Sequence, residues 1–527
     1  MRRILHRGDI VLLILGIAVA AGAVLAITTP GYMDAEYYFV TANELSRGSG
    51  FEEPFIWNYL NAPTSVRHPS HGYWQPFTSM AAASSMRLFG ASFRAGQVPF
   101  ILLTALLPLL TARFTFSIQQ DRRAAFLAGL LSAVPGYFLP FFLTTDMFIL
   151  YVWIGTLFFW SLHSGWKSRV STIWVASGVC MGLAHLARAD GLLFAVPFLY
   201  YISFDSKRFL RRTLLALVGY GFVMMPWFLR NWDVYGAILP PGSQYTFWLR
   251  SYEDLFRYPA SDLGPGFLLE AGWGEILSTR FWAFWTNVQR VIAENGLVFL
   301  LPLMVLGFVD QWKLRVVRSA AVYWAALILV MSFVFPFAGA QGGTFHSSAA
   351  LMPTLWMLVP FGLRRAVVWA GNRRDWNITQ ATINFGWILV FLAALFTAAT
   401  YVQRVYGFEV PEKSWGADYR TYDELGRDMS DLVPGPQVVM VNNPPGFYAA
   451  TGIPAVVVPS GGVDALEAAI ADYSVDYLIL DRNHPSGLRS LYALEDIPER
   501  VEFVRQVQIG RAGPLLIFRV SSGMEIE

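Results

Sequence analysis

Long apolar stretches recur along this chain, and they limit it to a small set of folds. The first, "DIVLLILGIAVAAGAVLAITT" at 9–29, is as long as a membrane-spanning helix. Hydrophobic residues make up 55% of the 527 residues and charged residues only 14%, which is unusual for a soluble globular domain. Inside hydrocarbon, only a helix satisfies every backbone polar group within one segment. The sequence therefore predicts a polytopic α-helical membrane protein.

The N-terminal run and the overall charge narrow the class further. A basic flank precedes the run, but the run is longer than a signal-peptide core and no convincing cleavage site follows, so we expect a retained first helix. The formal net charge of +2 gives no indication of a nucleic-acid partner. Cys180 is the single cysteine, so no disulfide can form within the chain.

The basic residues predict how the helices are oriented. Connectors at 1–9, 118–123, 164–170, 205–212, 310–318 and 364–375 contain 18 Lys and Arg against 5 acids. Those at 30–73, 144–146, 187–190 and 231–295 contain 7 against 14. The positive-inside rule places the first set in the cytoplasm and the second outside.

This alternation requires that the weakly apolar stretch 74–92 does not cross the bilayer. We predict an interfacial or re-entrant helix there, on the outer face. About eleven spans remain, near 9–29, 97–117, 124–143, 147–163, 171–187, 190–204, 213–230, 296–309, 319–337, 346–362 and 382–401. Residues 1–401 thus form a transmembrane domain with its first outer loop at 30–96, in a cell membrane and with the N-terminus cytoplasmic.

The tail from 402 to 527 has a different composition. It contains the β-branched runs "QVVMV", "AVVVP", "DYLIL" and "PLLIF", with the helical stretch "VDALEAAIADYSV" between the second and third. An odd number of crossings from a cytoplasmic N-terminus places this tail outside. We predict a small extracytoplasmic α/β domain.

The unusual polar residues fall on the predicted outer face, at helix ends or in the first outer loop. They are Asp34, Glu36, Arg67, His68, His71, Tyr73, Asp146, Arg188, Asp190, Arg230 and His346. Taken singly, each has an ordinary explanation: a solvated helix cap, an Arg188–Asp190 ion pair, loop histidines or aromatic membrane anchors. Their shared face favours a common site instead.

Such a set suits transfer from a lipid-linked phosphate. Arginine binds phosphate oxygens, and a carboxylate can take the proton of an acceptor hydroxyl as that hydroxyl attacks a sugar carbon. A fixed negative charge also stabilises an oxocarbenium-like transition state. Alternatively, Asp34, Glu36 and Asp146 could hold a divalent cation. No cofactor is certain.

Five segments resemble motifs of GT-C class glycosyltransferases, in particular dolichyl-phosphate-mannose protein mannosyltransferases and aminoarabinose transferases. "DAEYYFVTANELSRGSGF" resembles their first outer-loop motif, "YWQPF" their "hPPL" segment and "LTTDMF" their second acidic motif. "LARADGLLF" and "MPWFLRNWDVYG" resemble "TRPEGLLL" and "PWxxRNxxxxG". The order and spacing cover roughly 30–240. In the late "GGTFHSSAALMP", His346 stands where the family has an Arg.

The resemblance implies inverting transfer of a sugar from a polyprenyl phosphate to a glycan, lipid or protein hydroxyl on the extracytoplasmic face. Asp34 then corresponds to the catalytic base and Asp146 to the second acid. Ala35 stands where a Glu usually follows, which leaves the role of Glu36 open. Two other functions are considered: a transporter or flippase of lipid-linked sugars, and a non-catalytic relative that binds glycans. We find neither the internal repeat nor the mid-span acids typical of transporters.

Overall fold

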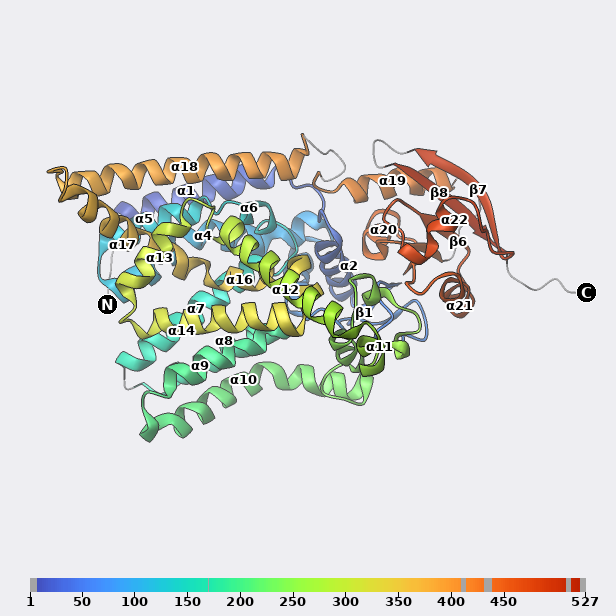
Figure 1. Cartoon of the computed structure of the whole chain (residues 1–527), viewed down its shortest axis with the longest axis horizontal. Coiled ribbons are helices and arrows are strands. Elements are labelled where there is room, and N and C mark those ends of the chain that lie inside the picture. The colour runs from blue at the N-terminus through green and yellow to red at the C-terminus, as the bar shows by residue number, and fades with distance from the viewer. Residues whose placement is uncertain (1–6, 169, 409–413, 431–437, 509–512, 522–527) are drawn as a thin grey trace, which may run out of the picture.

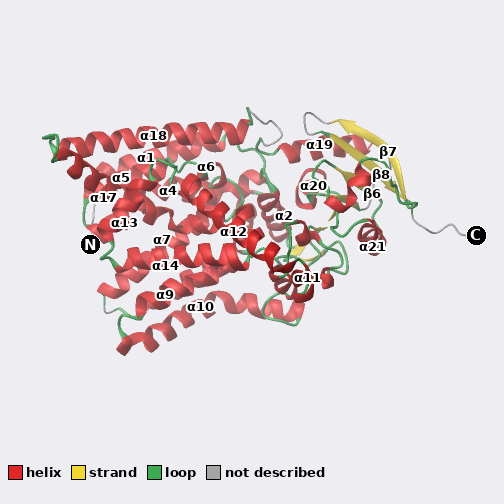
Figure 2. Ribbon diagram, viewed as in Figure 1, coloured by secondary structure: helices red, strands yellow, loops and turns green. Residues whose placement is uncertain are grey.

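A bundle of long helices forms most of the molecule, and a small sheet lies beyond one end of the bundle (Figure 1). The computed structural model describes residues 7–168, 170–408, 414–430, 438–508 and 513–521. The strands are confined to the end that holds the C-terminal segment (Figure 2). This arrangement confirms the predicted fold class, a polytopic helical protein with a small α/β region.

Seven helical segments of the described chain are long and apolar enough to cross a membrane. Each overlaps a predicted span. They are α1 (Arg7–Val24), α4 (Phe93–Gln119), α7 (Phe148–Lys167), α10 (Ser206–Tyr235), α14 (Arg315–Leu329) with the turn Val330–Val334, the run from Pro336 to Gly371, and α18 (Ile378–Tyr406). The run contains α15 (Pro336–Ala338), the turn Gly339–Gly343, α16 (Thr344–Ser348), the turn Ala349–Leu351 and α17 (Met352–Gly371).

The other four predicted spans correspond to shorter or broken helices. The segment predicted at 124–143 is divided by Pro135 and Gly136, whose φ is +65°, into two pieces. The pieces are α5 (Arg122–Ala133) and α6 (Phe138–Phe141). The other three predicted spans correspond to α8 (Thr172–Ala187), to Ala189–Phe194 with α9 (Ala195–Ile202), and to α13 (Leu301–Gln311).

One helix, α12 (Gly272–Arg290), lies in a segment predicted as an outer connector. Trp273, Leu277, Phe281 and Trp285 recur every four residues along it and are all exposed, which gives the helix one apolar stripe. Charged and polar residues between them lower the average hydropathy, so the sequence did not indicate a long helix. Through the turn Val291–Asn295, α12 leads towards α13.

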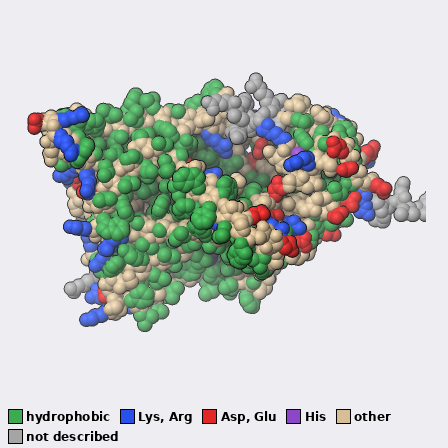
Figure 3. Space-filling view, viewed as in Figure 1, with side chains coloured by type: hydrophobic (Ala, Val, Ile, Leu, Met, Phe, Trp, Pro, Cys, Tyr) green, Lys and Arg blue, Asp and Glu red, His purple; other side chains and the backbone are tan. Residues whose placement is uncertain are grey.

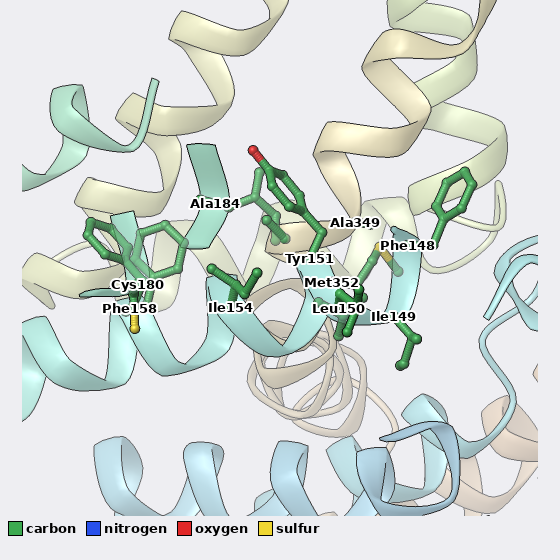
Figure 4. Packing of buried hydrophobic residues seen from close by; sticks show 14 of the residues in the cluster. Phe148, Ile149, Leu150, Tyr151, Ile154, Phe158, Cys180, Ala184, Ala349 and Met352 are labelled. Carbon is green, nitrogen blue, oxygen red and sulfur yellow. The ribbon is translucent and has the colours of Figure 1, made fainter. Parts of the chain in front are cut away.

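Small residues allow the helices to pack closely. A Cβ added at Gly178 would lie 1.9 Å from the Ala216 carbonyl oxygen, where α8 meets α10. One added at Gly362 would lie 1.8 Å from the Leu303 carbonyl oxygen, where α17 meets α13. The bundle core is apolar and centres on α7, where Phe148, Tyr151 and Phe158 are fully buried (Figure 4).

The first outer loop and the segment after α10 form a layer at one end of the bundle. The layer begins with α2 (Met33–Arg47) and includes α3 (Phe77–Phe89), the helix predicted at the interface. At about 1.5 Å per residue, α3 is too short to cross a bilayer. The other elements are β1 (Glu52–Glu53), β2 (Phe55–Ile56), β3 (His68–Pro69), α11 (Pro265–Glu270) and the turns Pro241–Phe247, Glu253–Phe256 and Ala260–Asp262.

The C-terminal segment forms a six-stranded mixed sheet in the order β2-β5-β4-β6-β8-β7. The four predicted strands correspond to β4 (Val439–Val441), β5 (Ala455–Val457), β6 (Tyr477–Leu480) and β8 (Pro514–Val520); β7 (Val501–Gln508) is added. The helices are α19 (Ala417–Ser430), α20 (Pro444–Thr451), the predicted α21 (Val463–Tyr473), Ser486–Leu488 and α22 (Arg489–Tyr492). The edge strand β2 comes from the first outer loop and pairs in parallel with β5.

Candidate functional site

Asp34 occupies the first turn of α2, directly after the connector that leaves α1. The unpaired backbone N–H groups of a helix N-terminus favour a carboxylate there. Its side chain is 28% exposed, so Asp34 is accessible to a substrate.

Asp146 reaches the same place from the loop between α6 and α7. The threonines of "LTTDMF" attach this loop to the start of α2: Thr144 Oγ1 donates to the Pro30 carbonyl and Thr145 Oγ1 to the Ala35 carbonyl, both at 2.8 Å. The Asp146 carboxylate accepts from its neighbour Met147 N at 2.5 Å and from the Tyr32 hydroxyl. Its side chain is 1% exposed, so this second acid is enclosed by protein.

His346, from α16, completes the group. Its Nε2 lies 3.2 Å from Asp146 Oδ2 and 3.6 Å from Asp34 Oδ2, and its ring stacks on Phe148 with centroids 4.1 Å apart. We call Asp34, Asp146 and His346 the Asp34 cluster. One ligand atom from each lies within 4.8 Å of the others, and among the described residues this is the one group of at least three acids, histidines or cysteines so arranged.

The contacts of His346 restrict its protonation. Nδ1 lies 2.9 Å from the Gly342 carbonyl oxygen, which can only accept, so Nδ1 carries a proton. Nε2 then faces two carboxylate oxygens. A stable arrangement requires a proton on Nε2, a proton on a carboxyl group, or a cation between them. Two carboxylates and an imidazole are ligands suited to a divalent metal such as Zn²⁺ or Mn²⁺.

Arg188 and Asp190 lie beside the cluster. Arg188 Nε donates to Asp190 Oδ1 at 2.9 Å, and the Ser347 hydroxyl, next to His346 in the chain, donates to Asp190. Arg188 is close enough that its charge lowers the pKa of Asp34. A guanidinium group therefore lies near the two carboxylates, where it can meet an anionic ligand.

The surroundings of Asp34 set its acidity. Burial of the carboxylate is the largest influence, and it is opposed by His346 and supported by the charge of Asp146; together they raise the pKa of Asp34 to about 6. A carboxylate of this basicity is ionised at neutral pH and is a better proton acceptor than an ordinary aspartate.

Glu36, the second acid of the opening motif, points elsewhere. It is fully buried, and its Oε2 accepts from Asn443 Nδ2 at 2.9 Å in the C-terminal segment. Burial, and then the charge of Asp418, raise its pKa to about 8. Glu36 is thus part of the contact between α2 and the C-terminal segment, and it is not a member of the Asp34 cluster.

Four other predicted site residues, two arginines and two histidines, have partners away from the cluster. Arg67 pairs with Glu44 at 2.9 Å and Glu52 at 3.1 Å. Arg230 donates to the Ser70 carbonyl at 2.9 Å and lies over the Trp227 ring.

Both loop histidines contact protein groups outside the Asp34 cluster. His68 pairs with Glu53 at 2.9 Å. His71 is 1% exposed, and burial lowers its pKa to about 3, so it stays neutral. The motif "SVRHPSHGYW" therefore builds the outer layer.

Three residues form hydrogen bonds to predicted site residues but were not themselves predicted: Tyr32, Ser347 and Asn443. Tyr32 precedes Asp34 by two residues and Ser347 follows His346, so proximity in sequence to a candidate acid or imidazole could have indicated both. Asn443 is far from Glu36 in sequence, and only the tertiary structure joins them.

Comparisons with known proteins concern the family and the fold. Residues 67–229 match the family model described as dolichyl-phosphate-mannose-protein mannosyltransferase. No curated protein sequence matches the chain. Among solved structures, ArnT from Cupriavidus metallidurans in the apo state is similar with a TM-score of 0.57 and 13% identity, covering 96% of this chain and 97% of that one.

The same protein bound to undecaprenyl phosphate is similar with a TM-score of 0.53 and 13% identity, covering 97% of this chain and 98% of that one. At this identity the likeness concerns the fold, which extends over the whole chain. The motif resemblance and the structural likeness agree: this chain has the fold of the GT-C membrane glycosyltransferases.

Proposed function

We propose that this protein transfers a sugar from a polyprenyl-phosphate donor to an acceptor hydroxyl, with inversion and with Asp34 as the base. The observation that supports this most is the unequal exposure of two adjacent carboxylates. Asp34 is 28% exposed and Asp146 only 1%, so one can reach a substrate while the other is held by protein groups.

The reaction follows from these positions. The donor keeps its lipid tail in the bilayer and brings its phosphate to the end of the bundle, where Arg188, whose charge acts on Asp34, can bind it. The acceptor oxygen attacks the anomeric carbon from the side opposite the phosphate, and Asp34 takes the proton of that hydroxyl. The bond between the anomeric carbon and the phosphate oxygen breaks, and polyprenyl phosphate leaves.

The cluster assists in two further ways. Asp146, held by Tyr32 and the Met147 N–H, places a fixed negative charge near the developing positive charge of the sugar ring. His346 orients both carboxylates. If a divalent cation binds, Asp34, Asp146 and His346 are the residues that would hold it, and it would supply charge to neutralise the leaving phosphate.

We place this reaction on the extracytoplasmic side of the cell membrane. Lys and Arg gather at the bundle end opposite the sheet, where few Asp and Glu are seen, whereas Asp and Glu, together with further Lys and Arg, gather over the sheet and outer layer (Figure 3). The positive-inside rule then puts the Asp34 cluster and the region 402–527 outside, with residues 1–401 as the transmembrane domain. The acceptor is a glycan, a lipid or a protein.

The test is transfer by purified Asp34→Asn protein in lipid nanodiscs with a panel of polyprenyl-phosphate sugars. We expect transfer to fall about 100-fold or more, because an amide cannot accept the proton. Asp464→Asn, an exposed position in α21, is the matched control. Full transfer by folded Asp34→Asn protein would falsify the assignment. Movement of lipid-linked sugar between leaflets without any transfer would favour a flippase.

A further inference from the structure

A pocket of about 150 Å³ lies between the first outer loop and the end of α10. Its lining includes Glu53, Trp57, Asn58, Tyr73 and Tyr235. None of the proposed catalytic groups lines it. The pocket is therefore a separate feature of the outer layer that the reaction, as described, does not use.

Aromatic rings form one wall of the pocket. Trp57 stacks on Trp74 with centroids 3.8 Å apart and planes 8° from parallel, and Tyr73 meets Trp57 edge-on at 5.1 Å. Trp57 is 3% exposed, so packing fixes the orientation of this wall. Rigid aromatic surfaces suit the apolar C–H faces of a sugar ring.

Polar groups are placed around the aromatic wall. Glu53 is only 4% exposed, and its Oε1 pairs with His68 at 2.9 Å. The Tyr37 hydroxyl accepts from the His71 N–H, and its own proton is directed to the Glu53 carboxylate. A carboxylate has about four lone-pair sites, so a ligand hydroxyl can add a further hydrogen bond to this one.

Asn58 supplies the complementary donor. Its Oδ1 accepts from Leu60 N at 3.0 Å, which leaves the amide N–H₂ for the pocket. By contrast, Asn61 uses its oxygen for Gly242 N and its nitrogen for the Gly72 carbonyl. The pocket thus offers one acceptor and one donor beside an aromatic wall, a combination that matches neighbouring hydroxyls of a neutral sugar.

Tyr73 links the pocket to the proposed reaction centre. Its pKa is raised to about 12, mainly by burial, and the charges of Arg188 and Asp34 also act on it. The inner wall of the pocket therefore lies within electrostatic range of both residues. A ring bound there would belong to a substrate whose reacting atom lies near Asp34.

We propose that this pocket is a saccharide-binding subsite that holds one sugar ring of the acceptor. The proposal rests on the proposed function for its role in transfer. The donor is positioned by its lipid and phosphate, whereas an acceptor needs contacts of its own next to the base. The acceptor class is accordingly a glycan or glycolipid.

The test compares Glu53→Gln and Asn58→Ala with Glu52→Gln in the full-length protein in nanodiscs. Glu52 is the neighbour of Glu53 but does not line the pocket. We expect KM for a glycan acceptor to rise about tenfold in the first two variants, with kcat within about twofold, and no change in Glu52→Gln. Tyr73→Phe, which keeps the ring, serves as the alternative if Glu53→Gln unfolds.

Kinetics in which the donor concentration is varied show whether the pocket binds the sugar ring of the donor or that of the acceptor. A rise in donor KM alone would assign the pocket to the donor ring and overturn the acceptor assignment. Unchanged KM values for both substrates would overturn the saccharide subsite.

A measurement of sugar binding to the pocket tests this proposal independently of whether the protein transfers sugar. Saturation-transfer NMR with methyl glycosides of mannose, glucose and N-acetylglucosamine should show contact with the unmodified protein and loss of contact in Glu53→Gln. If the unmodified protein transfers no sugar, the proposed function fails while this measurement still decides the pocket; absence of contact with every glycoside would reject it.

Discussion

Asp34 and Glu36 lie two residues apart in the first turns of α2, but their surroundings differ in every respect that governs chemistry. Asp34 is partly exposed and faces a second carboxylate and an imidazole. Glu36 is fully buried and faces an amide of the C-terminal segment. On a helix, residues two apart point in different directions, so one motif places one acid in the Asp34 cluster and the other against the C-terminal segment. Similarity of residue type within a motif therefore does not assign a common role.

The substitution Asp146→Asn, in the Asp34 cluster, should lower the transfer rate more than any substitution at the contact between Glu36 and the C-terminal segment. The amide keeps an oxygen for Met147 N but removes the charge that faces His346 and that we propose acts on the sugar ring. We expect transfer to fall about 1,000-fold. Turnover in nanodiscs measures this, with Asp464→Asn as control. Transfer within tenfold of the unmodified protein would mean that Asp146 has only a structural role.

The pH dependence of transfer should follow Asp34. Because its pKa is raised to about 6, the base is ionised above that pH and becomes protonated as pH falls below it. We expect kcat/KM to fall about tenfold for each further pH unit below 6. A profile with its midpoint near 4 would show that an ordinary carboxylate is the base.

His346→Gln should have a moderate effect. Glutamine can donate one hydrogen bond to Asp146 but cannot carry charge, so we expect transfer to fall about tenfold. His346 lowers the pKa of Asp34, so its removal should also move the acidic limb of the pH profile upward. A fall in rate with an unmoved limb would instead indicate a packing defect.

Glu36→Gln should change transfer least, within about twofold, and should act on stability. The pKa of Glu36 is raised from 4.5 to about 8, so the folded protein retains a proton that the unfolded chain releases above pH 4.5. Its contribution to stability is therefore complete below pH 4.5 and is lost as pH rises through 8, by a few kcal/mol in total.

Thermal unfolding at pH 5.5 and 8.5 measures this effect. The glutamine variant should lose less stability between the two pH values than the unmodified protein does. Glu52→Gln, at a half-buried position of the first outer loop, is the control. Equal losses in all three proteins would show that Glu36 is not protonated in the folded state.

Much of the candidate site could be predicted from the sequence, because the charged residues of the connectors predict on which side of the membrane each helix end lies. Charge asymmetry between connectors put Asp34, Asp146 and His346 on one face, and the motif order singled out the first two. The three do lie together. The structure gives Arg67 and Arg230 partners outside this cluster, Glu44 and the Ser70 carbonyl, because residues that share a face can still pair with their neighbours within it.

The remaining features depend on contacts between distant segments. The exposed stripe of α12 is interrupted by charges, so its mean hydropathy resembles that of a loop. The strand β2 is only two residues long, and its partner β5 lies about 400 residues later. Neither local propensity nor periodicity can indicate such a pairing.

The pairing of β2 with β5 has a consequence for how the protein is made. Phe55 and Ile56 leave the ribosome early, but the strand that pairs with them is synthesised near the end of the chain. Until then the outer loop next to Asp34 lacks its neighbour. The enzyme we propose would therefore acquire its finished outer face only after nearly all of its helices have been inserted, so that a chain interrupted before the sheet would be a membrane protein with an incompletely assembled site.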